Sequence, residues 1–463
     1  MRAFPGHAFS VVLFVLSASG VCAPAVAPRS ALLGHASAAT DVLRLPVRAN
    51  GLETVTLDFT PMKVFSDDAQ LIIVDRSGRE RRAELPGTRY YRVAAADDPG
   101  LSGVLAVAEA GNIFGLTRNG GEFSQLRFAP DGQLTQDRID MGAAPAREFQ
   151  CANDRSETGM SVDAASLLGH AGFAEAGPSA PTAAYTARIA IETDTEFLGR
   201  FSGNTTNATN YVGGLIGFIS TIYDAQVQTN MQVSFLRLWT SPDPYVETTP
   251  ECLLLESGKY WNANQTSTSR TTMHFLSGKT TTAGIAWVGV LCRGAFPTSQ
   301  SALGISCSEN LPASGNFGGA YGVTEGVSGS FNPGSPSVVW DVAGVAHEIG
   351  HNFNSPHTHC YSGIGGSPDP VDQCYGSESG CYSGTPTLPG PQGQGSGTIM
   401  SYCQLRPGGF SNVTLTFGTG HPFGVLPERV PSRMFAHVQS QAGSNPGCLA
   451  LQAVDLIFAN GFD

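Results

Sequence analysis

The chain has 463 residues, enough for two or three domains. Hydrophobic residues make up 41% of it and glycine occupies 56 positions, a composition typical of a globular protein rich in loops. The formal net charge is −12. This charge argues against nucleic acid or an anionic membrane as the partner, because both repel an acidic surface.

Residues 1–23 have the pattern of a secretory signal peptide. Arg2 is followed by an apolar run over 8–16 and then by small residues up to Ala23. The run is too short to span a membrane, and no other stretch is long enough. Cys22 suggests a lipoprotein cleavage site, but Val21 before it is larger than such a site normally has. We therefore expect an exported protein with no transmembrane segment.

Residues 24–157 predict a first, separate β-rich unit, because short apolar or alternating runs are separated by Gly, Asp and Pro. Its position favours a propeptide, and a permanent accessory domain is the alternative. Residues 158–184, rich in Ala, Gly and Pro, predict an exposed linker and the site of processing. The runs that suggest strands are Leu43–Val47, Thr54–Leu57, Gln70–Val74 and Val104–Val107.

Residues 185–448 alternate between strand and helix patterns, which predicts an α/β domain built on a mixed sheet. We expect strands at 187–194, 231–239 and 283–291, an extended segment at 318–323, and helices at about 209–227 and 432–442. Residues 449–463 form a C-terminal tail that is apolar for a terminus. The tail is either a sorting signal or a clasp, and the sequence does not distinguish these two roles.

One short motif contains the residues that could bind a metal ion and catalyse hydrolysis. His347 and His351 lie four residues apart, so a helix places them on one face, one turn from each other. Two imidazoles in this arrangement can bind one metal ion, and Glu348 comes with them. Metal-assisted hydrolysis needs this combination, because the metal lowers the pKa of its bound water and a carboxylate accepts the proton.

A catalytic zinc site has three protein ligands and one open position, and His357 supplies the third. Six residues of unbroken helix after His351 would point His357 away, so the helix must end and the chain must turn. Asn354 is suited to the left-handed conformation that ends helices, and Pro356 prevents helix continuation. His359 is a less favoured alternative ligand, because it lies further beyond the turn.

The spacing His347-Glu348-x-x-His351-x-x-Asn354-x-x-His357 resembles the metzincin zinc signature, HExxHxxGxxH. Gly397–Cys403, with Ile-Met-Ser-Tyr-Cys at its end, resembles the Met-turn of that family. The residues around both motifs are most similar to the adamalysin (reprolysin) branch, and a looser similarity covers about 185–448. Asn354 replaces the family's Gly. Thr358 stands where animal adamalysins carry Asp.

The resemblance implies a metzincin-like catalytic domain with a mostly parallel twisted sheet, a zinc helix and a Met-turn. It implies a single catalytic Zn²⁺ held by His347, His351 and His357, and no other bound cofactor. Glu348 would be the general base and then the proton donor to the leaving amine. The substrates would be proteins or peptides. In metzincins the segment at 318–323 is the exposed edge strand that binds the substrate backbone, and an ordinary Gly-rich strand is the alternative.

Two residues of the Met-turn have expected roles. Met400 should pack beneath the zinc, because a thioether is a poor zinc ligand beside imidazole. Tyr402 has the spacing at which the astacin and serralysin branches use a Tyr to stabilise the oxyanion. The adamalysin branch does not generally use this residue, so a core Tyr is the alternative to an oxyanion stabiliser.

The sequence contains ten cysteines. Cys22 leaves with the signal, and eight lie in the catalytic segment, an even number that fits an exported, disulfide-bonded domain. Cys151 is then the odd one. Its thiolate is a candidate zymogen-switch ligand that would fill the open position of the zinc, as in many metzincin propeptides. An idle or otherwise paired thiol is the alternative.

The sequence thus predicts a secreted zinc endopeptidase, made as a zymogen, that hydrolyses peptide bonds by Glu-assisted attack of a zinc-bound water. A secreted adhesion or binding protein with the same fold and no activity is the alternative. A degenerate site normally loses the Glu or one His, and here all four residues are present. Another HExxH hydrolase would have a Glu ligand on a later helix. Oligomeric state, cleavage specificity and disulfide pairing are not predicted.

Overall fold

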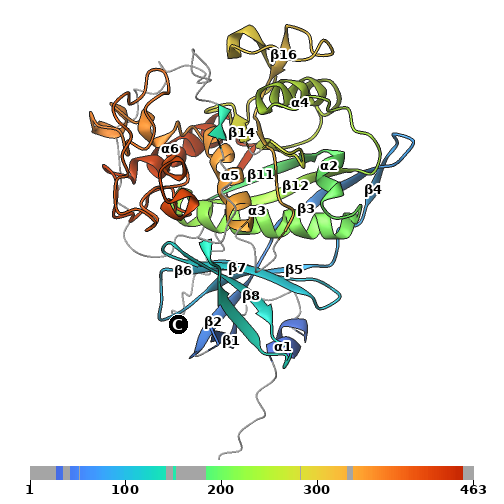
Figure 1. Ribbon diagram of the computed structural model, residues 1–463. Helices are drawn as coiled ribbons and strands as arrows, with labels where there is room; N and C mark the ends of the chain where they lie inside the picture. The colour runs from blue at the N-terminus through green and yellow to red at the C-terminus, as the bar shows by residue number, and fades with distance from the viewer. Residues whose placement is uncertain are drawn as a thin grey trace, which may run out of the picture.

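The computed structural model describes residues 28–34, 42–51, 53–141, 150–152, 184–281, 283–330 and 337–451. A β-barrel formed by N-terminal residues lies below a larger α/β part (Figure 1). The predicted signal peptide lies outside the described residues, as do nearly all of the predicted linker and residues 452–463 of the tail. In the described parts of the chain, no helix combines the length and apolarity that a membrane crossing requires.

The N-terminal unit is a closed barrel in which neighbouring strands are mostly antiparallel, in the order β1-β2-β5-β6-β7-β8-β9. A parallel pairing of β1 with β9 closes it, and Leu45, Phe59, Leu105 and Leu126 are among the side chains that fill its core. Helix α1 (Pro28–Gly34) adds Leu32 to that core. The strands are β1 (Leu43–Ala49), β2 (Glu53–Met62), β5 (Arg89–Ala94), β6 (Leu101–Val107), β7 (Ile113–Asn119), β8 (Glu122–Phe128) and β9 (Leu134–Arg138).

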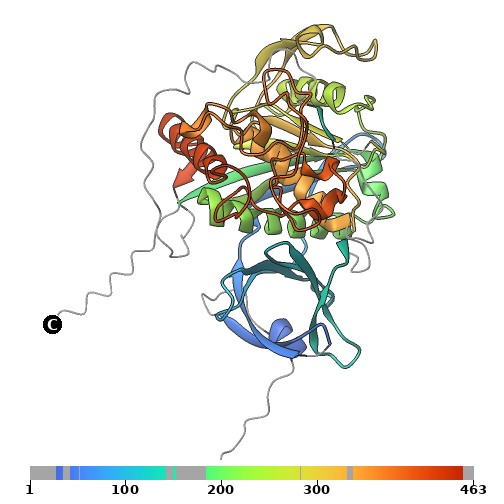
Figure 2. The same ribbon diagram turned by 60° about the vertical axis from the view of Figure 1, so that its left-hand side comes forward.

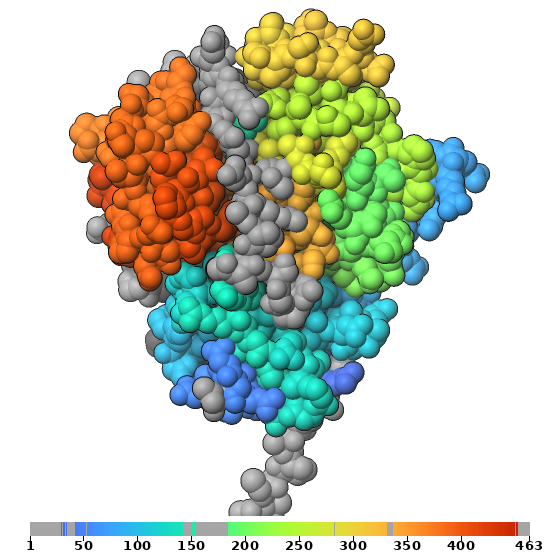
Figure 3. Space-filling model, viewed as in Figure 1, coloured from blue at the N-terminus to red at the C-terminus, as the bar shows by residue number. Residues whose placement is uncertain are grey.

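The prediction of a separate N-terminal unit is wrong in one respect. Strands β3 (Phe65–Val74) and β4 (Glu80–Ala83) leave the barrel and join the sheet of the α/β part. In Figure 2 the blue chain rises from the barrel into the upper part, and in Figure 3 blue atoms lie beside the green ones, away from the barrel. The apolar run that predicted a strand at 70–74 does form part of a strand, but sequence alone does not say which sheet a strand joins.

The α/β part contains a nine-stranded sheet in the order β10-β14-β17-β13-β11-β12-β3-β4, with β18 pairing β11. Its central pairs, from β17 to β3, are parallel, whereas β14, β4 and β18 pair antiparallel. The mixed α/β prediction is therefore correct. The strands not yet given are β10 (Gln150–Cys151), β11 (Tyr185–Thr193), β12 (Thr229–Trp239), β13 (Thr272–Leu276), β14 (Ala283–Ala286), β17 (Tyr321–Thr324) and β18 (Leu449–Leu451).

Helices cover both faces of this sheet, and strand residues alternate between the two cores. Ile189 and Ile191 of β11 pack with α3 (Thr205–Val227) and α5 (Ser337–Asn352), whereas Ala190 packs with α4 (Pro250–Asn264) on the other face. The remaining elements are α2 (Thr195–Gly199), the hairpin β15 (Phe296–Ser299) and β16 (Ser314–Gly318), and α6 (Arg429–Ser444). Short 3₁₀ turns occupy 301–303, 358–360, 364–366, 403–405 and 409–412.

Two sequence expectations in this part need correction. The final helix begins at Arg429 rather than Ser432, since Pro431 fits in the first turn, where a helix needs no amide donor. The segment expected to be the substrate-binding edge is β17, and it lies inside the sheet between β13 and β14. The edge strand of the α/β part is instead β14, which is followed only by the short β10.

Disulfides pair all eight cysteines of the α/β part: Cys252–Cys307, Cys292–Cys448, Cys360–Cys381 and Cys374–Cys403. Two of them tie down the irregular segment after the zinc motif. Cys292–Cys448 anchors the chain just before β18. Cys151 is in none of these bridges.

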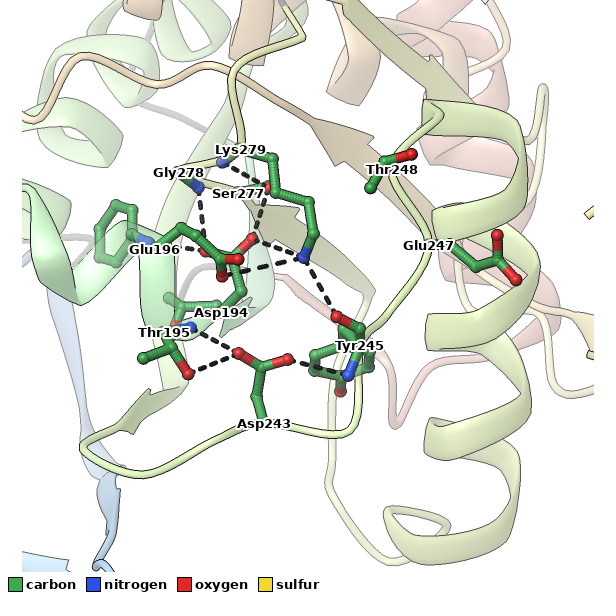
Figure 4. Close-up of polar contacts among 12 residues, drawn as sticks. Asp194, Thr195, Glu196, Asp243, Tyr245, Glu247, Thr248, Ser277, Gly278 and Lys279 are labelled. Atoms are coloured by element: carbon green, nitrogen blue, oxygen red, sulfur yellow. Dashed lines mark hydrogen bonds and ion pairs between the residues drawn. The ribbon is translucent and has the colours of Figure 1, made fainter. Parts of the chain in front are cut away.

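A buried charged corner fixes the carboxyl ends of β11 and β13 (Figure 4). Asp194 accepts hydrogen bonds from the backbone amides of Phe197 (2.7 Å) and Gly278 (2.9 Å), which cap α2 and hold the turn after β13. The Nζ of Lys279 lies 3.4 Å from a carboxylate oxygen of Asp194 and 3.2 Å from the Tyr245 carbonyl oxygen. This ammonium pairs with Asp194, and the bonds together hold the turns after β11 and β13 in place.

Candidate metal centre

The three histidines of the motif converge on one point. His347 and His351 project from the last two turns of α5, and their Nε2 atoms are 3.2 Å apart. His357 follows the turn after the helix, and its ring centroid lies 4.8 Å from that of His351 and 5.2 Å from that of His347. One ligand atom from each, together with the Sγ of Cys151, lies within 4.8 Å of the others. This spacing suits a tetrahedral ion.

Each imidazole is oriented by a hydrogen bond at its Nδ1. His347 Nδ1 is 2.7 Å from the Ile399 carbonyl oxygen, and His351 Nδ1 is 2.6 Å from the carbonyl oxygen of Ser355. His357 Nδ1 is 2.7 Å from Oε2 of Glu378. An imidazole that donates from Nδ1 presents the Nε2 lone pair, so all three rings offer a metal ligand toward the same centre.

The turn that brings His357 back is built as its residue types indicate. Asn354 has φ = 76°, in the left-handed region, immediately after the helix. Arg433 of α6 holds this turn, because its Nε donates to the Asn354 carbonyl oxygen at 2.6 Å. The helix end and the third ligand are thus fixed together.

The donor set fits a metal ion such as Zn²⁺. All three imidazoles are buried, and the Nε2 of His357 has no hydrogen-bond partner among the described residues, an arrangement that a bound metal would satisfy. Burial, with a smaller contribution from neighbouring His357, lowers the pKa of His347 to about 3 and that of His351 well below its usual value. Neutral imidazoles at pH 7 are the form that binds metal.

Met400 lies beneath the site and is fully buried. Its carbonyl oxygen accepts the backbone amide of Thr358 at 3.0 Å, which fixes the residue after the third histidine. A Cβ built on Gly350 would lie 2.6 Å from the Met400 sulfur, so any larger residue here would require the Met400 side chain to shift. Met400 therefore packs against α5 at Gly350, between His347 and His351 in the sequence.

Glu348 faces the same space and is also completely buried. Burial raises its pKa well above the ordinary value. A Cβ on Gly284 of β14 would lie 2.5 Å from a Glu348 carboxylate oxygen, so a larger residue on the edge strand would displace the Glu348 side chain from its present position. The sequence analysis did not single out Gly284, because a glycine in a strand pattern has no signature of its own.

Cys151 enters the site from β10. It lies beside Gly284 in the parallel pairing of β10 with β14. Its Sγ is 3.5 Å from a Glu348 carboxylate oxygen and 3.5 Å from His351 Nε2. The buried hydroxyl of Tyr402 donates to the Cys151 carbonyl oxygen at 2.6 Å, and its ring centroid is 4.4 Å from that of His357. The structure thus brings both residues of uncertain role to the three histidines.

Sequence reasoning missed Glu378, which lies in the loop closed by Cys360–Cys381. Its Oε2 is 2.7 Å from both His357 Nδ1 and His359 Nε2. Burial alone would raise the pKa of Glu378, but the two imidazoles lower it well below the usual range. His359 is therefore bonded to the carboxylate behind His357. No motif marks an acidic residue in this Gly- and Ser-rich segment.

We expect Glu378→Gln to weaken Zn²⁺ binding by about 10- to 100-fold, the usual effect of losing a partner that orients a metal-binding histidine. Competition titration with a chromophoric chelator measures this change directly. Glu309→Gln, the same substitution at an exposed position, is the matched control and should leave the affinity unchanged. Equal affinities in both variants would show that Glu378 does not position His357.

Comparison with known proteins agrees with this arrangement. Residues 183–412 match the family model Reprolysin_5, metallo-peptidase family M12. The match confirms that this segment resembles the reprolysin-like branch of the metallopeptidases. A search of curated proteins finds no match.

Two solved structures are distantly similar. Metalloproteinase-II from Bacteroides fragilis is 12% identical, with 68% of this chain and 82% of that chain covered and a TM-score of 0.33. A chaperone–substrate complex is 11% identical, with 70% and 38% covered and a TM-score of 0.27. Both scores are too low to support an argument about fold or function.

Proposed function

We propose that this protein is an exported zinc endopeptidase with a metzincin-like catalytic domain, made as a zymogen. The observation that carries the proposal is the convergence of His347, His351 and His357 on one point, with the carboxylate of Glu348 facing the same space. The family of residues 183–412 supports peptide-bond hydrolysis, and the disulfides support export.

Zinc, when bound, would polarise the substrate carbonyl and lower the pKa of a water at the open position. Glu348 would accept the proton of that water and then give it to the leaving amine. The edge strand β14 would align the substrate backbone by strand addition, in the place that β10 occupies here. The hydroxyl of Tyr402 donates to the Cys151 carbonyl, and it would donate to the carbonyl oxygen of a substrate in the same way.

The contacts of Cys151 and β10 would also keep the intact chain inactive. Cys151 lies beside the three histidines, and its thiolate would take the fourth position of a tetrahedral ion and close the position that the water needs. The β10 backbone also covers part of the substrate-binding edge. An intact chain should therefore be inactive or nearly so.

Metal dependence tests the proposed function. We expect the Cys151→Ala protein to cleave casein and a quenched fluorescent peptide, to lose this activity on dialysis against a chelator, and to regain it with about one equivalent of Zn²⁺. Far-ultraviolet circular dichroism of the metal-depleted protein controls for unfolding. Undiminished cleavage by folded, metal-free protein would contradict the proposal.

A further inference from the structure

The hairpin of β3 and β4 comes from the N-terminal unit but forms two strands of the catalytic sheet. The barrel closes without it, because β2 pairs directly with β5. The hairpin extends away and pairs β3 in parallel with β12, from Phe235 opposite Gln70 to Trp239 opposite Val74. The barrel itself is therefore not what completes the sheet; a segment inserted between two of its strands does so.

Side chains of β3 enter both catalytic cores. Leu71 and Ile73, 3% and 4% exposed, pack in the core that contains α3 and α5. Ile72 and Val74, 8% and 1% exposed, pack in the core on the α4 face. These four side chains have no role in the barrel core, so their apolar surface is buried only while the two parts stay together.

Polar contacts tie the hairpin down as well. Asp68 makes a bidentate ion pair with Arg188 of β11 at 2.9 and 2.8 Å, and the hydrogen bond from Arg188 helps to lower the pKa of Asp68 to about 2. The amide of Thr240 donates to the Val74 carbonyl oxygen at 3.0 Å. Glu80 lies 3.5 Å from the guanidinium of Arg237, which is fully buried.

The barrel wall makes further contacts with the α/β part. Arg92 pairs with Asp224 of α3, and Arg118 donates to the Leu415 carbonyl oxygen at 2.6 Å. By contrast, β10 pairs with β14 at only two positions. Among the residues that the structure describes, the N-terminal unit therefore pairs with the catalytic sheet over a longer strand than β10 does.

Removal of the whole unit would leave β12 as a long unpaired edge, with the apolar side chains of Phe235, Leu236, Leu238 and Trp239 losing their cover. Exposed apolar edges of this kind promote aggregation. We propose that the N-terminal unit is a permanent, strand-donating part of the enzyme, which stays bound after the chain is cut, and that activation requires release of the Cys151 segment alone.

This inference predicts how cutting affects latency. A single cut within 158–184 leaves Cys151 attached to a unit that does not dissociate, so its effective concentration at the site stays high. The cut protein should stay latent. A second cut within 142–149 separates the Cys151 segment from the barrel, and this segment, whose described part pairs with β14 at two residues, can then leave.

The experiment uses the full chain with sites for two different site-specific proteases, one inserted within 142–149 and one within 158–184. After the second site alone is cut, we expect the fragments to co-elute on gel filtration and peptide hydrolysis to stay at the uncut level. After both are cut, the barrel fragment should still co-elute, the backbone amides of 235–239 should stay protected from hydrogen exchange, and hydrolysis should rise at least tenfold.

Separation of the barrel fragment from a folded, soluble catalytic fragment would overturn the inference, as would full activity after the linker cut alone. The binding readouts do not depend on activity. Co-elution without hydrolysis in any form would leave this inference standing and count against the proposed peptidase function.

A matched pair of variants tests the role of β3. Ile73→Ala removes a buried side chain that contacts the catalytic core and should weaken association of the doubly cut fragments by about 30-fold or more. Ile113→Ala makes the same change in the barrel, where the partly buried Ile113 packs against the barrel core, and should leave association nearly unchanged. If the two substitutions weakened association equally, β3 would not be what holds the two fragments together.

Discussion

Replacement of Glu348 by Gln should lower kcat/KM for peptide hydrolysis by roughly 10²- to 10⁴-fold, the range that a positioned general base contributes. The measurement is best made in the Cys151→Ala background, so that latency does not hide the effect. The reason is specific: the amide keeps the size of the side chain against Gly284 but cannot accept the proton of the attacking water. The three histidines remain, so zinc content should stay near one per chain.

Glu348→Asp is the matched control for this prediction. It keeps a carboxylate but shortens the reach, so it should retain more activity than Gln while it binds the same amount of zinc. Glu348→Gln protein as active as its parent would exclude Glu348 as the base. Loss of zinc together with activity would assign Glu348 a structural role instead.

Replacement of Cys151 by Ala should raise hydrolysis by the intact chain at least tenfold. The thiol is the nearest competitor for the open position, since its sulfur lies 3.5 Å from His351 Nε2. Part of the inhibition should persist, because the backbone of β10 still pairs with β14 and the Tyr402 hydroxyl still has the carbonyl of residue 151 as its acceptor. Initial rates on a quenched peptide, with intact chain length checked by mass spectrometry, give the answer.

Ala152→Ser, at the neighbouring buried position, keeps the thiol and should remain latent. Equal low activity in Cys151→Ala and the parent would show that the thiol does not impose latency, and the backbone of β10 would then be the remaining inhibitor. High activity in the unaltered, intact chain would contradict the zymogen altogether.

The residues of the metal site were predictable because their signal is local. The spacing of His347 and His351 predicts that they share a helix face. Asn354 and Pro356 predict that the helix ends before His357. The structure places these residues as that pattern suggests, including the left-handed Asn354. Short-range sequence patterns carry this information because helices and turns are short-range structures.

What sequence did not predict depends on long-range pairing. The apolar run at 70–74 is the same whether β3 stays in the barrel or joins β12, and the strand patterns at 283–291 and 318–323 do not say that β14 rather than β17 is the edge. Glu378 reaches His357 only because the Cys360–Cys381 disulfide folds an irregular loop back on the site. The position of the N-terminal unit between a predicted signal and a catalytic domain suggested a removable propeptide. It gave no indication that β3 and β4 of this unit join the catalytic sheet.

The most direct test of the account is X-ray absorption at the zinc edge on the intact chain and on its Cys151→Ala variant. We predict zinc in both, with three nitrogen ligands at about 2.0–2.1 Å, and one sulfur at about 2.3 Å in the intact chain only. The variant should show a light atom in place of the sulfur. A chain that binds no zinc, or a shell without three nitrogen ligands, would contradict the metal centre, and sulfur absent from the intact chain would contradict the switch.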